Sequence, residues 1–184
     1  MTTIPLCPDD SPTERTLFSW RHFSGVLRDT TLPNGVETTT FTLEHPGAVV
    51  ILPIAATGSI LFLSQYRPAI GTTILELPAG TLEKGEDPAT CAAREVIEET
   101  GFAARELLPL GQLLPAPGFC NEVQWCFVAR DLTPASAAAD EDEVIEVVEV
   151  HVAELPALIA SGRLYDGKSL GVLMKGVVAG VLTI

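Results

Sequence analysis

Short apolar runs and alternating segments follow one another along most of this chain, and few of them are long enough for a helix. Apolar runs of four to eight residues indicate buried strands, and runs rich in Val, Ile, Thr and aromatic residues indicate strands on a half-buried surface. Turn signals separate several of them, notably Pro33-Asn34-Gly35, which is typical of a hairpin. The pattern predicts strands at residues 16–28, 36–44, 48–53, 60–65, 74–77, 107–116, 123–130 and 144–152.

Three segments have helical features instead. The first is the clearest, because Asp87 is a cap residue, Pro88 suits the first helical position and Gly101 is a typical stop signal. Two further helices are expected at residues 154–161 and from residue 166 to about residue 181. Because strands outnumber helices and the helices come singly between them, the pattern predicts an α/β fold with a mixed sheet between helices.

The helix between Asp87 and Gly101 carries a dense group of acids. Glu95, Glu98 and Glu99 lie close together on it, since side chains three and four positions apart are neighbours on a helix. Each like-charge pair destabilises an isolated helix by about 0.2–0.5 kcal/mol. A solvated acidic surface explains such a group, but so does a site for divalent cations, because magnesium prefers oxygen ligands and binds substrate phosphates.

The spacing of the residues around these acids favours the cation site. Gly80 is followed by five residues and Glu86, then by seven residues and the run Arg94-Glu95-Val96-Ile97-Glu98-Glu99-Thr100-Gly101-Phe102. This arrangement resembles the signature of the Nudix hydrolases at every defined position. The resemblance implies a Nudix-type α/β/α sandwich with a mixed β-sheet in residues 47–184. Residues 1–46 are then expected to be a tail and a small N-terminal β appendage used for dimerisation.

Segments outside the signature resemble one branch of that family, the ADP-ribose pyrophosphatases. They are Gln65-Tyr66-Arg67, residues 76–80, and Pro117, which lies 16 residues after Gly101. The resemblance implies hydrolysis of the pyrophosphate bond of ADP-ribose or a related nucleoside diphosphate sugar, which gives two monophosphates. It also implies a homodimer built through the N-terminal strands.

The same resemblance assigns a metal site to the signature. Glu95 and Glu99 are expected to ligate Mg²⁺, with Mn²⁺ as the alternative, and the carbonyl of Ala79 is expected to complete the site. Glu98 lies beside them and is a candidate for both metal binding and catalysis. Arg94 is expected to orient the glutamates.

The resemblance also implies that the base that takes a proton from water lies in the acidic loop before the last strand. Glu141 and Glu143 are the candidates, and either one is alternatively a further metal ligand. A loop that is only a solvated acidic surface is the competing interpretation.

The resemblance further implies that the substrate contacts several residues outside the signature. Arg67 is expected to bind the diphosphate unless it is an ordinary surface arginine, and Glu76 to bind substrate or hold Arg67. Trp20 or Phe23 is a candidate for stacking a base across the dimer, with packing in the sheet as the alternative. The branch usually carries an arginine on the strand that corresponds to residues 38–42, and its absence here leaves the particular substrate open. The remaining substrate-binding candidates are Phe119 and Glu122.

Composition narrows the class of protein further. The formal net charge of −13 gives no general means of holding a phosphate backbone, so a nucleic-acid polymer is not an expected partner. The four cysteines form no Cys-x-x-Cys pair, which fits a reducing cytoplasm. The chain does not begin with a basic segment and an apolar run, and the apolar residues 170–184 are too few for a membrane span. We therefore expect a cytoplasmic protein without a membrane segment.

Three functions remain open at this point. The first is a magnesium-dependent hydrolase of a nucleoside diphosphate sugar. The second is a Nudix hydrolase of another nucleotide, such as a dinucleotide, a coenzyme or a nucleoside triphosphate. The third is a regulator that binds a nucleotide without catalysis, although a pure binding protein has no need for the clustered acids Glu95, Glu98 and Glu99.

Overall fold

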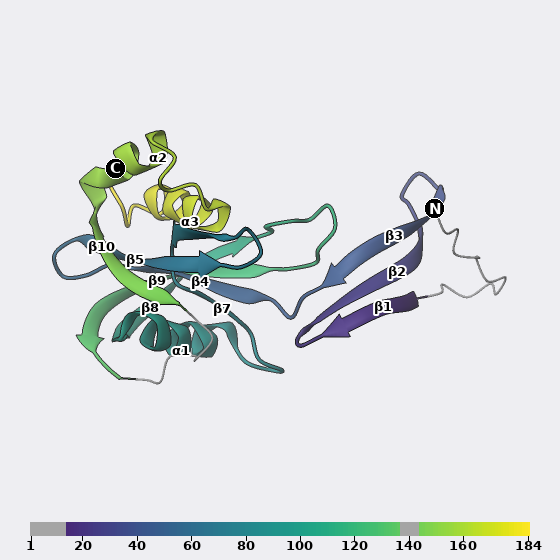
Figure 1. Ribbon diagram of the computed structural model, residues 1–184, viewed down its shortest axis with the longest axis horizontal. Coiled ribbons are helices and arrows are strands. Elements are labelled where there is room, and N and C mark those ends of the chain that lie inside the picture. The colour runs from purple at the N-terminus through teal and green to yellow at the C-terminus, as the bar shows by residue number, and fades with distance from the viewer. Residues whose placement is uncertain (1–13, 137–143) are drawn as a thin grey trace. The chain divides into compact units, whose positions relative to one another are not determined.

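The computed structural model describes residues 14–136 and 144–184 of the chain. Over these residues strands predominate and the helices stand singly, which confirms the predicted α/β class (Figure 1). The strands are β1 (Glu14–Trp20), β2 (Phe23–Thr31), β3 (Glu37–Glu44), β4 (Ala48–Pro53), β5 (Ser59–Arg67), β6 (Thr72–Glu76), β7 (Ala79–Thr81), β8 (Phe102–Leu113), β9 (Gln124–Pro134) and β10 (Ile145–His151). The helices are α1 (Pro88–Thr100), a 3-10 turn (Val152–Glu154), α2 (Leu155–Ala160) and α3 (Gly167–Val178).

The described chain separates into two compact units. The first contains residues 14–45 together with Ala116–Glu122, and the second contains Pro46–Pro115 and Val123–Ile184. The inclusion of Ala116–Glu122 in the first unit has no signal in the sequence. It follows from backbone pairing, because the Leu43 N–H donates to the Phe119 carbonyl at 2.7 Å and the Asn121 N–H donates to the Leu43 carbonyl at 3.2 Å.

The first unit is built on an antiparallel sheet in the order β1-β2-β3. The prediction of one strand over residues 16–28 is wrong, because the chain reverses between Trp20 and Phe23, which face each other in the register of β1 and β2. Arg21 makes this turn possible by adopting a left-handed backbone with φ of 51°. The predicted turn at residues 33–35 is confirmed, and the Gly35 N–H donates to the Leu32 carbonyl at 2.8 Å.

The second unit contains two sheets, in the orders β7-β4-β9-β8 and β10-β5-β6. In the first of these β4 is parallel to β9 and antiparallel to β7, so the predicted mixed sheet is confirmed. Alternate residues of β4 point to opposite faces. Val49 and Ile51 pack in a cluster with α1, whereas Val50 and Leu52 pack in a cluster with α2 and α3.

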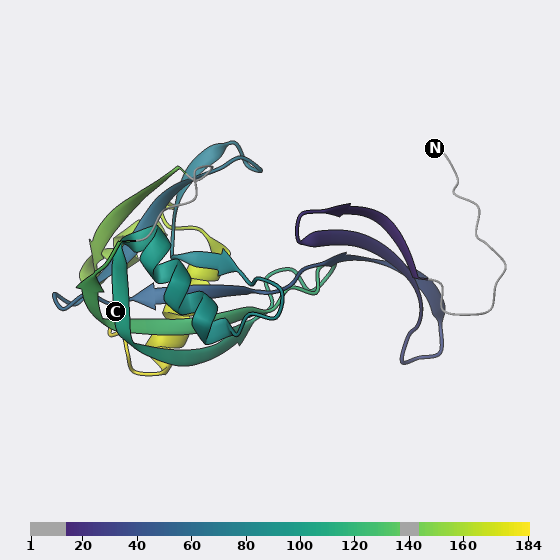
Figure 2. The same cartoon turned by 90° about the horizontal axis from the view of Figure 1, so that it is seen from below.

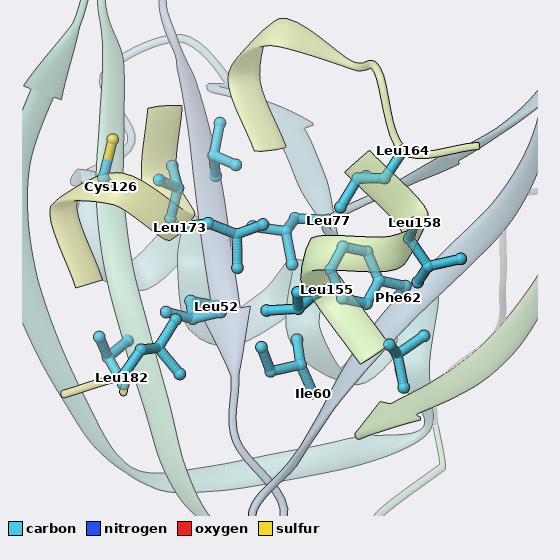
Figure 3. Close-up of a cluster of buried hydrophobic side chains, with 14 residues drawn as sticks. Leu52, Ile60, Phe62, Leu77, Cys126, Leu155, Leu158, Leu164, Leu173 and Leu182 are labelled. Carbon is cyan, nitrogen blue, oxygen red and sulfur yellow. The ribbon is translucent and has the colours of Figure 1, made fainter. Parts of the chain in front are cut away.

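Helices therefore cover both faces of the sheets in this unit. Figures 1 and 2 show α1 on one side of the strands and α2 and α3 on the other, the arrangement of an α/β/α sandwich. The larger cluster lies on the side of α2 and α3, and Figure 3 shows its side chains. Leu77 is fully buried in this cluster, which anchors the chain immediately before the signature.

Several boundaries differ from the sequence-based predictions. β8 begins at Phe102 rather than 107, and β9 continues to Pro134 rather than 130, because the two strands extend together as one antiparallel pair. β7 is too short to show a pattern and exists through its pairing with β4. In the part of the chain that the structure describes, no helix has both the length and the apolar character needed to cross a membrane.

Candidate functional site

The signature helix α1 forms as the local sequence predicts. The Asp87 carboxylate caps it by accepting from the backbone N–H groups of Ala89 at 3.0 Å and Thr90 at 3.2 Å. At its other end Gly101 has φ of 74°, a left-handed conformation that suits glycine, and its N–H donates to the Ile97 carbonyl. The caps fix where the helix begins and ends, and therefore which way its glutamates point.

Arg94 is the centre of the acidic group. Its Nη1 donates to Glu95 Oε1 at 2.7 Å and to Glu98 Oε2 at 2.9 Å. Its Nε and Nη2 donate to the two oxygens of Glu86, each at 3.1 Å, in a bidentate pair. Three carboxylates around one guanidinium carry a net negative charge, and this charge favours cations. The predicted orienting role of Arg94 matches these contacts in geometry.

Glu99 lies next to the backbone that leads into β7. Glu99 is only 7% exposed, and its Oε2 accepts from the Ala79 N–H at 2.8 Å. Gly80 follows in β7, and a Cβ placed there would come within 1.9 Å of the Glu95 carboxylate. The absence of a side chain at Gly80 therefore allows the backbone of β7 to approach the glutamates of α1.

The structure thus brings together the predicted metal ligands Ala79, Glu95 and Glu99 where α1 meets β7. Glu98 lies near Glu95, because both accept hydrogen bonds from Arg94. Across residues 14–136 and 144–184, no three His, Cys, Asp or Glu side chains already converge as a ligand set. Of the predicted ligands, Glu95 and Glu98 are hydrogen-bonded to Arg94 instead. The glutamates are nonetheless not splayed into solvent, because the Glu95 side chain is 12% exposed and that of Glu98 is 32% exposed.

The local environment assigns protonation states in this group. Hydrogen bonds from Arg94 lower the pKa of Glu86, and hydrogen bonds to Glu86 are the largest cause of a raised pKa for Arg94. Burial, reinforced by the charges of Glu86 and Glu95, raises the pKa of the Cys91 thiol to about 12. Cys91 therefore stays protonated at neutral pH and does not serve as a thiolate nucleophile.

The substitution Glu86→Gln is expected to lower the stability of the fold at pH 7. It should also make that stability less dependent on pH in the acidic range. Because the pKa of Glu86 in the folded protein lies below its usual 4.5, ionised Glu86 stabilises the fold above that pH, and the contribution is lost as the pH falls through the folded-state pKa. The gap in melting temperature between wild type and variant should be full at pH 7 and shrink below pH 4.5. Exposed Glu106 on β8 supplies the control, Glu106→Gln. A gap that does not change with pH would contradict the Arg94–Glu86 pairing.

A second ionic group surrounds Glu76, which is fully buried at the end of β6. Glu76 Oε1 accepts from Arg67 Nε at 2.7 Å, and Glu76 Oε2 accepts from Lys168 Nζ. Lys168 also donates to Asp166 at 3.0 Å. Of the two roles left open for Glu76, the structure shows the contact with Arg67. Lys168 has no place among the predicted residues, because it lies 92 positions from its partner and no local pattern links the two.

Three of the predicted substrate contacts, Trp20, Phe119 and Glu122, lie in the first unit. Trp20 is 62% exposed and stacks on Phe23 with ring centroids 6.3 Å apart, so it is not a core residue. Phe119 is 56% exposed, and Glu122 Oε1 lies 4.0 Å from His45 Nε2. Arg67, Glu76 and the signature residues belong to the second unit. The candidate bases Glu141 and Glu143 lie outside the described residues.

Comparisons with known proteins agree with this geometry. The chain matches the family profile described as the NUDIX domain over residues 44–168. It is 37% identical over 163 residues to the ADP-ribose pyrophosphatase of Bacillus subtilis (strain 168), covering 85% of this chain and 88% of that protein. It is also 37% identical over 156 residues to the methanol dehydrogenase activator of Bacillus methanolicus, covering 84% of each.

A solved structure supports the same relationship at the level of the fold. It is a crystal structure of an ADP compounds hydrolase, with a TM-score of 0.76, 26% sequence identity, and coverage of 90% of this chain and 92% of that one. The family profile covers well over half of the chain, and within the matched residues Glu86, Glu95 and Glu98 meet around Arg94 of α1. The chain therefore belongs to the Nudix hydrolase family.

Proposed function

We propose that this protein hydrolyses the pyrophosphate bond of a nucleoside diphosphate sugar, ADP-ribose or a close relative, with Mg²⁺, and releases two monophosphates. The observation that carries the proposal is the approach of Glu95 and Glu99 to the backbone of β7 at Ala79 and Gly80, with Glu98 held beside Glu95 by Arg94. The substrate class follows from the Bacillus subtilis relative, which is named for ADP-ribose, and from the solved ADP compounds hydrolase.

The residues at this site fit a divalent metal ion. Nudix hydrolases depend on such an ion, and carboxylate and carbonyl oxygens are the ligands that hard cations prefer. Glu95, Glu98, Glu99 and the carbonyl of Ala79 supply oxygen donors only, and Gly80 leaves room for Glu95 beside β7. When bound, the metal neutralises phosphate charge and makes a water molecule more acidic. We propose Mg²⁺ for this role, with Mn²⁺ as a substitute.

The chain's own residues would bind the substrate and move the proton. Arg67 keeps 37% of its side chain exposed while Glu76 holds its Nε. Within the described residues this leaves its other guanidinium donors for the diphosphate. Arg94 would keep Glu95 and Glu98 in position. The base that would take the proton from water is Glu98, Glu141 or Glu143. The Glu98 side chain is 32% exposed, which leaves it accessible to water.

We further propose that the protein works as a homodimer in the cytoplasm. The fully exposed strand β1 and the exposed rings of Trp20 and Phe119 provide surface for a second copy or for a base of the substrate. Glu122 would then contribute a polar contact to the substrate. The cysteines in the described part of the chain are free and buried, which suits a reducing compartment.

A hydrolase of another nucleotide is the second candidate, and one observation favours it. β3 has the sequence Glu-Thr-Thr-Thr-Phe-Thr-Leu-Glu and lacks the arginine that the ADP-ribose pyrophosphatase branch usually carries there. A different set of base and phosphate contacts follows from that difference, and a dinucleotide, a coenzyme or a nucleoside triphosphate would be the alternative substrate.

A substrate panel is expected to place a nucleoside diphosphate sugar first. ADP-ribose, GDP-mannose, a dinucleotide, coenzyme A and ATP would each be incubated with Mg²⁺, and the products separated by ion-exchange chromatography. For ADP-ribose or GDP-mannose we expect kcat/KM above about 10⁴ M⁻¹ s⁻¹, with AMP or GMP among the products. When EDTA removes the metal ion, hydrolysis should stop. A clear preference for the dinucleotide, coenzyme A or ATP would favour the second candidate. No turnover of any compound with Mg²⁺ or Mn²⁺ would refute hydrolysis.

A further inference from the structure

The short segment from Glu76 to Ala79 connects β6 to the candidate metal site, and separate elements hold it. The Leu77 N–H donates to Ser169 Oγ at 2.7 Å, and the Pro78 carbonyl accepts from the Ile51 N–H at 2.8 Å. The Ala79 N–H donates to Glu99 Oε2 at 2.8 Å. Proline has no N–H, so every backbone donor between Leu77 and Ala79 is bonded outside the segment.

The contact with Ser169 comes from the N-terminal end of α3, where Ser169 is fully buried. Asp166 caps this helix: its Oδ2 accepts from the Ser169 N–H at 3.0 Å and from the Ser169 hydroxyl at 2.6 Å. A hydroxyl has one proton to donate and lone pairs that accept. Because the proton goes to Asp166, the oxygen of Ser169 is oriented to accept from Leu77.

A second contact joins the start of α3 to Glu76, the residue just before Leu77. Glu76 is fully buried, and a buried carboxylate is costly unless cations pair with it. Lys168 supplies one partner from α3 and Arg67 supplies the other from β5. The side chain of Lys168 therefore affects the carboxylate that holds Arg67, the residue assigned to the diphosphate.

We propose that Asp166, Lys168 and Ser169 at the start of α3 form a positioning element for the catalytic site. Ser169 fixes the backbone that brings Ala79 and Gly80 against Glu99 and Glu95, and Lys168 fixes Glu76 and through it Arg67. The role assigned to the three residues is to position others, through Leu77 and Glu76, and not to ligate the metal. This inference rests on the proposed function, since it assigns a role toward the same metal and the same diphosphate.

The substitution Ser169→Ala is expected to weaken metal binding in the absence of any substrate. It removes the acceptor of the Leu77 N–H, so the segment carrying Ala79 is no longer fixed from α3. Residues that orient metal ligands typically change metal affinity by about 10- to 100-fold when replaced, and a loss in this range is expected for Mn²⁺ measured by electron paramagnetic resonance. Ser161→Ala is the matched control, because Ser161 Oγ donates to the Leu158 carbonyl at 3.1 Å on α2, away from the segment.

The substitution Lys168→Met tests the contact between Lys168 and Glu76. It also keeps the proposal testable if Ser169→Ala does not fold. It is expected to raise KM for the substrate about tenfold through Arg67, with part of the effect restored in Lys168→Arg, which keeps a cation beside Glu76. Wild-type affinity for Mn²⁺ in a folded Ser169→Ala protein would show a merely structural role and overturn the proposal. Unchanged KM in Lys168→Met would overturn the part that concerns Arg67.

The failure of this proposal and that of the proposed function give different results. Wild-type protein that binds no Mn²⁺ would overturn the proposed function and this inference with it. Wild-type protein that binds Mn²⁺ and hydrolyses the substrate, with both variants unchanged, would overturn this inference alone.

Discussion

Replacing Glu99 with Gln is expected to abolish turnover while leaving the fold intact. The amide of Gln keeps an oxygen that accepts from the Ala79 N–H, so the contact between α1 and β7 survives. The carboxylate charge that binds the metal is lost, however, and metal ions contribute several kcal/mol to stabilising the transition state. Since each 1.36 kcal/mol is a factor of ten, a decrease in kcat of about a thousandfold is expected.

Steady-state hydrolysis at saturating Mg²⁺ measures this effect, with circular dichroism and melting temperature as tests of the fold. Glu106→Gln removes the same charge from an exposed position on β8 and should keep wild-type kcat. A folded Glu99→Gln protein with the rate of the wild type would remove Glu99 from the metal site.

Replacing Gly80 with Ala is expected to have the second largest effect. The added Cβ would lie 1.9 Å from the Glu95 carboxylate and 2.3 Å from Glu95 Cγ, a distance at which something must move. The carboxylate is the far end of a flexible side chain, so Glu95 can turn away, although its hydrogen bond to Arg94 is then lost. A ligand that has turned away no longer holds the metal, and a decrease of about a hundredfold in kcat/KM is expected.

This prediction separates activity from stability. The matched substitution Gly118→Ala places a Cβ where nothing lies within 4 Å, on a backbone that is not left-handed. Both variants should melt within a few degrees of the wild type, and only Gly80→Ala should lose activity. If Gly80→Ala kept full activity, Glu95 would not need its position beside β7, and its assignment as a metal ligand would be wrong.

The parts of the fold that were predictable carry local signals. The ends of α1 are set by Asp87, Pro88 and Gly101, each of which acts on the backbone within one turn of itself. The turn at residues 33–35 contains the Asn-Gly pair that favours positive φ. By contrast, the turn at Arg21 has no glycine, asparagine or proline, and its left-handed backbone is imposed by the pairing of β1 with β2.

The candidate site divides in the same way. The contact of Arg94 with Glu98 follows from helical spacing, because the two residues lie four positions apart. The contact of Arg94 with its neighbour Glu95 does not follow from that spacing. Neither Lys168 nor Ser169 carries any such signal, because each meets its partner across 92 positions. Such contacts depend on how α3 packs against β4 and β8, which is decided by the common core and not by any short pattern.

The most direct test of the metal site is the anomalous difference density of a crystal soaked in Mn²⁺. A peak is expected in direct contact with carboxylate oxygens of Glu95, Glu98 or Glu99, with the Ala79 carbonyl among its ligands. A crystal in which Mn²⁺ binds elsewhere, while Glu95 and Glu98 remain on Arg94 and Glu99 on the Ala79 N–H, would contradict it.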